Sequence, residues 1–337
     1  MTQTCIETRE PDNALALLPR IGRALAMIMA TVVISNIGLS RAAEPASPVM
    51  TLRKIAEDVY TMQHPTGSSN ASFIVTPDGV LVFDLDIRTG DQVMAAIRRT
   101  TDKKVRYVVT SHPSGDHATG AWHFREDKPV YIATRKQMRD LYMQEKVEFE
   151  EYKASKDPRY APYRNTELVQ PDFGFEGALT LQFGGLTFQF TEEGSGHSPS
   201  DVTLYIPQRR VVMMGDLLNN EIHPGQGESA QVFFSNSRNW ITILDRIIER
   251  RLPVDTFVPG HGPVHIGRGV ADLEDQRRYF VVMRNEVSKM IAAGRTVQQV
   301  QAEFKVPAEF AHYGGPTRLK AFLNLFYNQL VERGYWP

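Results

Sequence analysis

The chain of 337 residues contains a single cysteine, Cys5, and has no excess of charge of either sign. One thiol cannot form an intramolecular disulfide or a cluster of thiolate metal ligands. The 38 Lys and Arg residues nearly balance the 39 Asp and Glu residues, so the net charge gives no reason to expect a nucleic-acid partner. Metal ligands and catalytic groups must therefore come from histidines, carboxylates and hydroxyls.

The N-terminal apolar segment is too short for a typical membrane span. Residues 24–39 form a mostly apolar run behind Arg20 and Arg23, whereas a spanning helix needs about 20 apolar residues. Small residues follow around Ala42, so we expect residues 1–42 to be a secretory signal peptide. An uncleaved N-terminal anchor is the alternative. Both interpretations predict a periplasmic or secreted folded part, and cleavage would leave it without stable membrane insertion.

Short apolar runs alternate with amphipathic stretches from about residue 51 onward. Turn-forming residues separate three pairs of apolar runs and predict three β-hairpins: 71–75 with 80–84, 178–183 with 186–190, and 202–206 with 210–214. A helical pattern covers residues 90–99, and a buried-strand pattern covers residues 105–110. This alternation favours a layered α/β fold for residues 51–270.

The last part of the chain has a helical pattern. Apolar residues recur at helical spacing from Phe280 to Met290, and Thr296 with Gln299 has the spacing of a capping box. We predict a C-terminal helical extension over residues 271–337, packed on the preceding domain. Apolar stripes of this kind are normally core contacts.

The strongest chemical signal is the segment His112-Pro-Ser114-Gly-Asp116-His117, which directly follows the predicted strand 105–110. Two imidazoles and a carboxylate in one short segment can converge on a divalent cation such as zinc. Open α/β sheets place their sites at strand ends of this kind. Taken alone, however, the segment is explained equally well as a polar turn.

Three later segments place further potential ligands on glycine-rich loops. These are His197 in GSGHSPSD, Asp216 in GD and His261 in PGHG. Glycine lets the backbone bend so that one side chain can face a shared centre. Each segment alone has an equally good structural explanation, but together and in this order they indicate a common site.

This order of residues resembles the metallo-β-lactamase superfamily. The resemblance rests on the His112-x-Ser114-x-Asp116-His117 segment, on the three later ligands His197, Asp216 and His261, and on Asp84 at the end of GVLVFD. It covers residues 54–270 and implies the fold of that family, an αββα sandwich of two mixed β-sheets. The metals of the family lie at one edge of the sheets.

The resemblance also implies a role for each residue. Carried over one by one, the ligands of a first metal site are His112 and His197, and those of a second are Asp116, His117 and His261. Asp216 takes the position of a carboxylate that bridges the two metals in many members. Asp84 is expected to orient the ligand loop from behind.

Ser114 departs from the family pattern, which has a third histidine at this position. A hydroxyl is a poor zinc ligand, and even the loss of a residue that only orients a ligand costs about 10- to 100-fold in metal affinity or activity. We therefore expect zinc at a well-filled second site and a weak or empty first site. Water held by Ser114, or Asp216 itself, would partly repair the first site.

The function implied by the resemblance is that of a zinc-dependent hydrolase acting on a small-molecule substrate. A metal-bound hydroxide would attack an ester, thioester, lactone or lactam-type bond, and Asp116 would orient that hydroxide or accept its proton. The leader and the helical pattern around Trp240 resemble exported members associated with quinoprotein and sulfur-oxidation systems. In such a protein β-lactam hydrolysis would be a weak activity.

Two alternatives remain open. The first is a degenerate metal-binding accessory protein without turnover, which Ser114 would explain. The second is an iron-dependent sulfur oxygenase, which is less favoured because it relies on the first metal site.

Other histidines and aromatic residues have no assigned role. Four histidines match no ligand position and are interpreted as surface or core residues: His123, His223, His265 and His312. His64 lies on a loop that could border the site. Four aromatic residues either line a substrate groove or pack within an inserted segment: Tyr160, Tyr163, Phe173 and Phe175.

Overall fold

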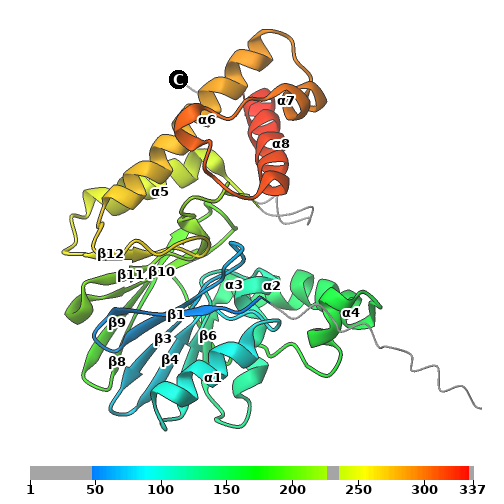
Figure 1. The fold of residues 1–337 in the computed structure, drawn as a ribbon. Helices are drawn as coiled ribbons and strands as arrows, with labels where there is room; N and C mark the ends of the chain where they lie inside the picture. Colours follow the sequence, from blue (N-terminus) through cyan, green and yellow to red (C-terminus); the bar gives the residue numbers. More distant parts are fainter. Residues whose placement is uncertain (1–47, 226–234, 334–337) are drawn as a thin grey trace, which may run out of the picture. The chain divides into compact units, whose positions relative to one another are not determined.

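Two β-sheets lie face to face in the computed structural model, which describes residues 48–225 and 235–333 (Figure 1). The seven-stranded sheet contains, in spatial order, β1 (Thr51–Ala56), β2 (Val59–Gln63), β3 (Ala71–Thr76), β4 (Gly79–Phe83), β5 (Val105–Val109), β6 (Val130–Thr134) and β7 (Phe173–Phe175). The five-stranded sheet contains β12 (Thr256–Val258), β11 (Val211–Met213), β10 (Asp201–Ile206), β9 (Leu186–Gly194) and β8 (Ala178–Phe183). Both sheets are mixed, because parallel pairs run from β4 to β7 and join β11 to β12, whereas the other neighbours are antiparallel.

Helices connect the strands and follow the second sheet. The α-helices are α1 (Gly90–Thr100), α2 (Gly115–Ala118), α3 (Arg135–Asp140), α4 (Lys146–Ala154), α5 (Ser237–Glu249), α6 (Ala271–Ala292), α7 (Val297–Glu303) and α8 (Pro316–Arg333). A π-helical turn, η2 (Leu141–Glu145), joins α3 to α4. The predicted signal peptide, residues 1–42, lies outside the described residues.

The alternation of strand side chains explains the layers. In β4, Leu81 and Phe83 belong to the core between the two sheets, whereas Val80 and Val82 pack on the opposite face in a cluster that includes Val93 of α1. Strands of the second sheet alternate in the same way, and their outer face is covered by α5 and α6. The predicted αββα sandwich of two mixed sheets is confirmed.

The C-terminal helices share a core with α5. Trp240 of α5 is buried, and its ring lies 4.7 Å from the ring of Phe280 on α6, which in turn lies 6.1 Å from the ring of Phe326 on α8. The Thr296–Gln299 capping box is present at the start of α7, as its spacing predicts. The predicted helical extension is therefore confirmed as a feature of the fold, whereas the boundary at residue 270 remains a prediction.

The three predicted hairpins correspond to β3–β4, β8–β9 and β10–β11. β9 is longer than its apolar run, because its last residue, Gly194, still pairs with Asp201 at the start of β10. Polar residues therefore continue this strand to the edge where His197 lies.

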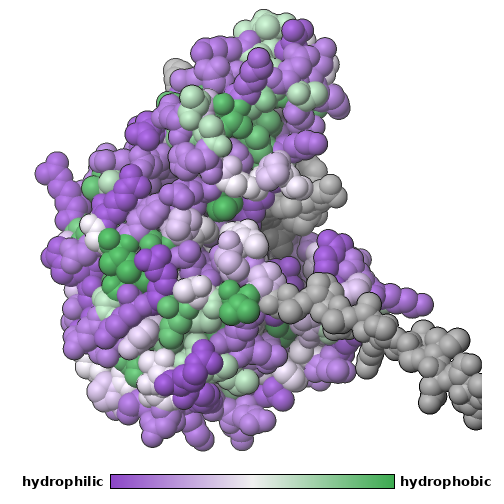
Figure 2. All heavy atoms as spheres, in the orientation of Figure 1, coloured by the Kyte–Doolittle hydropathy of each residue, from purple (hydrophilic) through white to green (hydrophobic). Residues whose placement is uncertain are grey.

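The face shown in Figure 2 is mostly hydrophilic, with hydrophobic side chains in separate small patches. Isolated exposed apolar residues are normal for a folded protein. Within residues 48–225 and 235–333, we find no helix with the length and apolar character needed to cross a bilayer.

Replacing Trp240 should test the shared helical core. Trp240→Ala removes a fully buried ring and the hydrogen bond from its Nε1 to the Leu217 carbonyl oxygen at 2.9 Å. We expect the free energy of unfolding to fall by about 3–5 kcal/mol, measured by urea denaturation. Thr242→Ala, on the exposed face of the same helix, should change it by less than about 0.5 kcal/mol. Equal effects of the two substitutions would contradict this packing.

Candidate metal centre

The predicted ligands meet at one edge of the sheets, each on a segment that follows a strand. His112 follows β5, Asp116 and His117 lie in α2, His197 follows β9, Asp216 follows β11, and His261 follows β12. Glycine is required beside one of these ligands. At Gly215, where φ is +51°, a β-carbon would collide with the side chain of Ser111.

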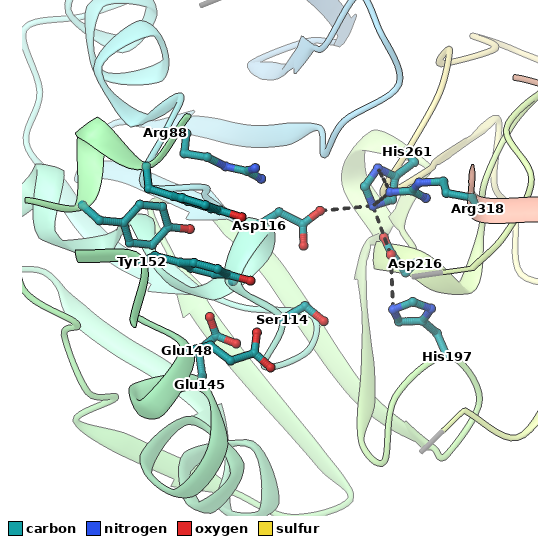
Figure 3. A pocket seen from close by; sticks show the side chains of 13 residues that line it. Arg88, Ser114, Asp116, Glu145, Glu148, Tyr152, His197, Asp216, His261 and Arg318 are labelled. Atoms are coloured by element: carbon teal, nitrogen blue, oxygen red, sulfur yellow. Dashed lines mark hydrogen bonds and ion pairs between the residues drawn. The ribbon is translucent and has the colours of Figure 1, made fainter. Parts of the chain in front are cut away.

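Asp216 lies at the centre of the cluster (Figure 3). Its Oδ2 atom is 3.1 Å from His261 Nε2 and 3.3 Å from His197 Nε2. Its Oδ1 atom is 3.1 Å from His117 Nε2. His112 is more distant, with Nε2 3.9 Å from Asp216 Oδ2. The cluster is therefore organised around one carboxylate.

Among the residues that the structure describes, two groups of three have donor atoms within 4.8 Å of one another. The first consists of Asp116, His117 and His261, the set predicted for the second metal site. The second combines His112 and Asp216 with His117. In this geometry His117, rather than His197, is the imidazole grouped with His112.

The carboxylate of Asp84 orients the ligand loop from behind. Its Oδ1 accepts a hydrogen bond from the Ser111 backbone N–H at 2.6 Å, and its Oδ2 accepts one from Ser111 Oγ at 2.8 Å. Asp84 Oδ2 also lies 3.0 Å from His117 Nδ1. Because Nδ1 donates to this carboxylate, Nε2 is the His117 nitrogen that faces the cluster and would bind a metal once its proton is displaced.

His261 is oriented by the loop that contains His64, although His64 itself bonds within that loop, to Thr66. The Gly67 carbonyl oxygen lies 3.0 Å from His261 Nδ1 and accepts a hydrogen bond from it. Asn70 holds the PGHG loop by donating from Nδ2 to two backbone carbonyl oxygens, those of Pro259 at 3.1 Å and Gly262 at 2.9 Å. His261 therefore also presents Nε2 to the cluster.

These residues fit a divalent metal. His112 Nδ1 bonds to Ser111 Oγ at 2.9 Å, whereas the buried His112 Nε2 has no hydrogen-bond partner within the described part of the chain. An unsatisfied buried nitrogen is unfavourable unless a bound water or ion serves as its partner. Imidazole and carboxylate donors together suit zinc.

The charges in the cluster depend on one another. Burial disfavours the charged form of His117, but the carboxylates of Asp216, Asp116 and Asp84 outweigh it and raise its pKa well above the usual value. Burial lowers the pKa of His112 and of His197 to about 3, so both are neutral. Neutral imidazoles are the form that binds metals. A dication would replace the proton that His117 holds among these carboxylates.

The cluster forms one end of a cavity of about 170 Å³. The other lining residues include several that the sequence analysis missed or left open: Arg88, Glu145, Glu148, Tyr152, Tyr160, Tyr163 and Arg318. Ser114 also lines this cavity, with 6% of its surface exposed. Phe175, by contrast, packs between the sheets. The aromatic part of the cavity wall is therefore made by tyrosines of the inserted segment.

Two arginines in the cavity differ in their partners. Arg88 is held by Asp86, with Nε 2.8 Å and Nη2 2.5 Å from Asp86 Oδ2. Arg318, from α8, places Nη2 3.2 Å from His261 Nε2. Its buried Nη1 has no hydrogen-bond partner among the described residues. No sequence signal identifies Arg318, because a lone charge in an amphipathic helix is normally a solvated residue.

The histidines without an assigned role make contacts outside the cluster. His123 bonds to the Ile87 carbonyl, His223 to Tyr279 Oη and His265 to Asp272, while His312 is exposed. These contacts agree with their interpretation as surface or core histidines.

Removing the Asp84 carboxylate should weaken metal binding. Asp84→Ala leaves His117 Nδ1 without its acceptor, and we expect the affinity for zinc to fall by about 10- to 100-fold, measured by competition with a chromogenic chelator. Asp91→Ala is the matched control, because Asp91 pairs with His123 at 3.0 Å, away from the cluster. An unchanged affinity in Asp84→Ala would show that His117 is not oriented in this way.

Comparisons with known proteins agree with this geometry. The family model of the metallo-beta-lactamase superfamily matches residues 64–261. A linear primary-alkylsulfatase from a Pseudomonas species is 22% identical over 269 residues, which are 71% of this chain and 50% of that protein. A metallo-beta-lactamase type 2 from Bacillus cereus is 23% identical over 95 residues, 28% of this chain and 36% of that protein.

Solved structures show the same fold. A sec-alkylsulfatase from a Pseudomonas species superposes with a TM-score of 0.62 at 19% identity, covering 83% of this chain and 50% of that one. A metallo-beta-lactamase from Pontibacter korlensis superposes with a TM-score of 0.55 at 17% identity. This match covers 69% of this chain and 99% of that one. The chain thus spans about half the length of the alkylsulfatases that it matches.

The relatives are hydrolases by name, and the site has residue groups able to hold a metal. Since the family model covers more than half of the sequence, this chain belongs to the metallo-β-lactamase superfamily.

Proposed function

We propose that this protein is an exported, zinc-dependent hydrolase of a small substrate that carries an anionic group. The observation that carries the proposal is the convergence of six potential ligands at the end of a polar cavity: His112, Asp116, His117, His197, Asp216 and His261. The bond to be broken is an ester, thioester, lactone or lactam-type bond, and the alkylsulfatase relative adds sulfate esters to the candidates.

The donor set favours unequal metal sites. Asp116, His117 and His261 would hold one zinc ion well, because all three donor atoms lie close together. The first site would have His112 and His197, with Asp216 between the two sites, and Ser114 stands where a further imidazole is expected. A bound zinc ion would supply Lewis-acid chemistry, activating water and polarising the bond to be broken.

Asp116 is the group best placed to handle a proton. Its Oδ2 lies 3.4 Å from His261 Nε2 and 3.7 Å from His117 Nε2, and about a quarter of its side chain is exposed to the cavity. Burial opposes ionisation, but His117 and His261 outweigh it and lower the pKa of Asp116. An ionised carboxylate at this position can orient water and accept its proton.

Arg318 supports an anionic substrate. Its guanidinium faces the cavity beside His261, and its Nη1 has hydrogen-bonding capacity that the described residues do not use. Guanidinium groups bind carboxylate, phosphate and sulfate-like groups through paired hydrogen bonds. Arg88 cannot take this role as readily, because Asp86 already pairs with it.

The proposed function can be tested with zinc-loaded protein and a panel of alkyl sulfate, carboxyl ester, thioester, lactone and β-lactam substrates. We expect zinc to bind and at least one class to turn over. Asp116→Asn should lower kcat by about 10²- to 10⁴-fold, and His261→Ala should release zinc. His312→Ala, an exposed histidine, is the control.

The outcomes of this test separate the alternatives. Zinc binding without turnover of any class would identify a metal-binding accessory protein. Bound iron with oxygen consumption would identify an oxygenase, and the absence of any bound metal would contradict the proposal. Export is tested separately, by the size and cellular fraction of the mature chain.

Arg318 should determine selectivity for the anionic group. Arg318→Gln is expected to raise KM for an anionic substrate by about 10- to 100-fold, the loss of a charged hydrogen bond, while KM for a neutral analogue changes little. Lys320→Gln, an exposed cation on the same helix, should leave both values unchanged. An equal loss with neutral and anionic substrates would contradict charge recognition by Arg318.

A further inference from the structure

A second buried carboxylate lies behind the loop that carries His197. Asp201 is buried at the start of β10 and ends the segment GSGHSPSD, four residues after His197. It belongs neither to the two groups of candidate metal ligands nor to the residues that line the cavity. Any contribution of Asp201 to the site must therefore act through other residues.

The Asp201 carboxylate binds the backbone on both sides of His197. Its Oδ2 accepts a hydrogen bond from the Gly196 N–H at 2.9 Å. Its Oδ1 accepts one from the Ser198 N–H at 3.0 Å, and Oδ2 lies 3.1 Å from the same nitrogen. These bonds fix the peptide group before Gly196 and the one that joins His197 to Ser198. They therefore restrict rotation of the backbone from which the imidazole extends.

The carboxylate and the loop stabilise each other. A buried carboxylate needs hydrogen bonds to keep its charge. Burial raises the pKa of Asp201 to about 7, although the hydrogen bonds from Ser198 and Gly196 oppose the rise. A different loop conformation would cost the carboxylate its donors and the two backbone N–H groups their acceptor. Asp201 therefore favours the one conformation that supplies both bonds.

Glycine before His197 lets the loop lie close to its supports. A β-carbon added at Gly196 would lie 2.8 Å from Leu217 Cδ2 and 3.2 Å from Asp201 Oδ2. A larger residue at position 196 would thus push the loop away from Leu217, away from the carboxylate, or both.

The loop held in this way directs His197 at the centre of the cluster. His197 Nε2 lies 3.3 Å from Asp216 Oδ2. The start of α5 adds a second support, because the Asn236 N–H donates to the Gly196 carbonyl oxygen at 2.8 Å. The ring of Trp240 lies 5.4 Å from the imidazole of His197, at 77° to it. The imidazole is therefore placed by the contacts of its loop.

We propose that Asp201 is a positioning residue for the first metal site, and that it holds His197 in the orientation in which Nε2 can bind the metal. This inference rests on the proposed metal centre. The two sites then have different supports, since Asp84 bonds to His117 whereas Asp201 bonds to the loop of His197. Loss of the Asp201 carboxylate should weaken the first site and spare the second.

Zinc titration calorimetry on the metal-free full chain tests the inference without any substrate. We expect two equivalents in the wild type, one tight and one weaker. In Asp201→Asn an amide nitrogen, which cannot accept a hydrogen bond, replaces one oxygen. The affinity of the weaker equivalent should fall about 10- to 100-fold, while that of the tight one is unchanged. Asp201→Ala, which removes both oxygens, should cause at least as large a loss.

Glu193→Gln is the matched control for removing a buried carboxylate. Glu193 is buried in the neighbouring strand β9, but its Oε1 pairs with Arg250 Nη1 at 2.6 Å, away from the ligand loop. This variant should lower the free energy of unfolding and keep both zinc equivalents. Hydrogen exchange of the backbone amides in residues 194–201 should quicken in Asp201→Asn and stay unchanged in Glu193→Gln.

Two further measurements separate positioning from a general loss of stability. With cobalt as the probe, the visible spectrum of the weaker site should change in Asp201→Asn, while the spectrum of the tight site is retained. Gly196→Ala should weaken the same equivalent with the carboxylate still present. Circular dichroism of each metal-free variant checks that it folds, and Gly196→Ala carries the test if neither Asp201 variant folds.

The inference and the proposed function fail differently. An unchanged weaker equivalent in the Asp201 variants, equal losses at both equivalents, or the same loss in Glu193→Gln would overturn the role of Asp201 and leave the hydrolase proposal intact. A wild type with a single equivalent would also overturn it, because no second ion would then depend on His197. A wild type that binds no metal would overturn both proposals.

Discussion

The buried carboxylate of Asp84 makes the contacts on which the geometry of the candidate metal centre depends. Asp84 directly follows β4 in a left-handed conformation, with φ 61°, and its carboxylate joins the end of that strand to Ser111, which follows β5, and to His117 in α2. Ser111 in turn makes two further contacts. Its hydroxyl contacts His112, and its carbonyl oxygen accepts a hydrogen bond from Val202 N–H of the second sheet at 2.8 Å.

This arrangement explains how candidate ligands from distant parts of the sequence are brought to the same place. Strand ends of both sheets are tied together at one edge, so each following loop begins from a defined position. Glycines at the tight approaches then let individual loops turn towards Asp216. The order of the cluster is therefore a property of the sandwich edge, and the metal would bind to an arrangement that the fold has already prepared.

The fold and most residues of the candidate metal centre were predictable because their signals are local. The alternation of side chains along β4 places Leu81 and Val82 on opposite faces of the sheet. The candidate ligands His112, His197 and His261 each lie on a loop that contains glycine or proline and follows an apolar run. Glu145 and Arg318 have no such signal, because each is one charged residue among many in a helix. Their place in the cavity wall depends on tertiary packing, which brings η2 and α8 to the same cavity, and helical periodicity does not encode that contact.

The cavity combines two sources of residues with different constraints. Its candidate metal ligands follow strands that are fixed by the sheets, whereas Arg318 lies on α8, where Phe322 and Phe326 pack against Phe280 of α6. Proteins that share the sandwich can thus diverge in substrate range through their helices alone. Under the proposed function, a small rotation or shift of α8 would move the Arg318 guanidinium relative to the substrate anion, while the candidate metal ligands at the sandwich edge would keep their positions.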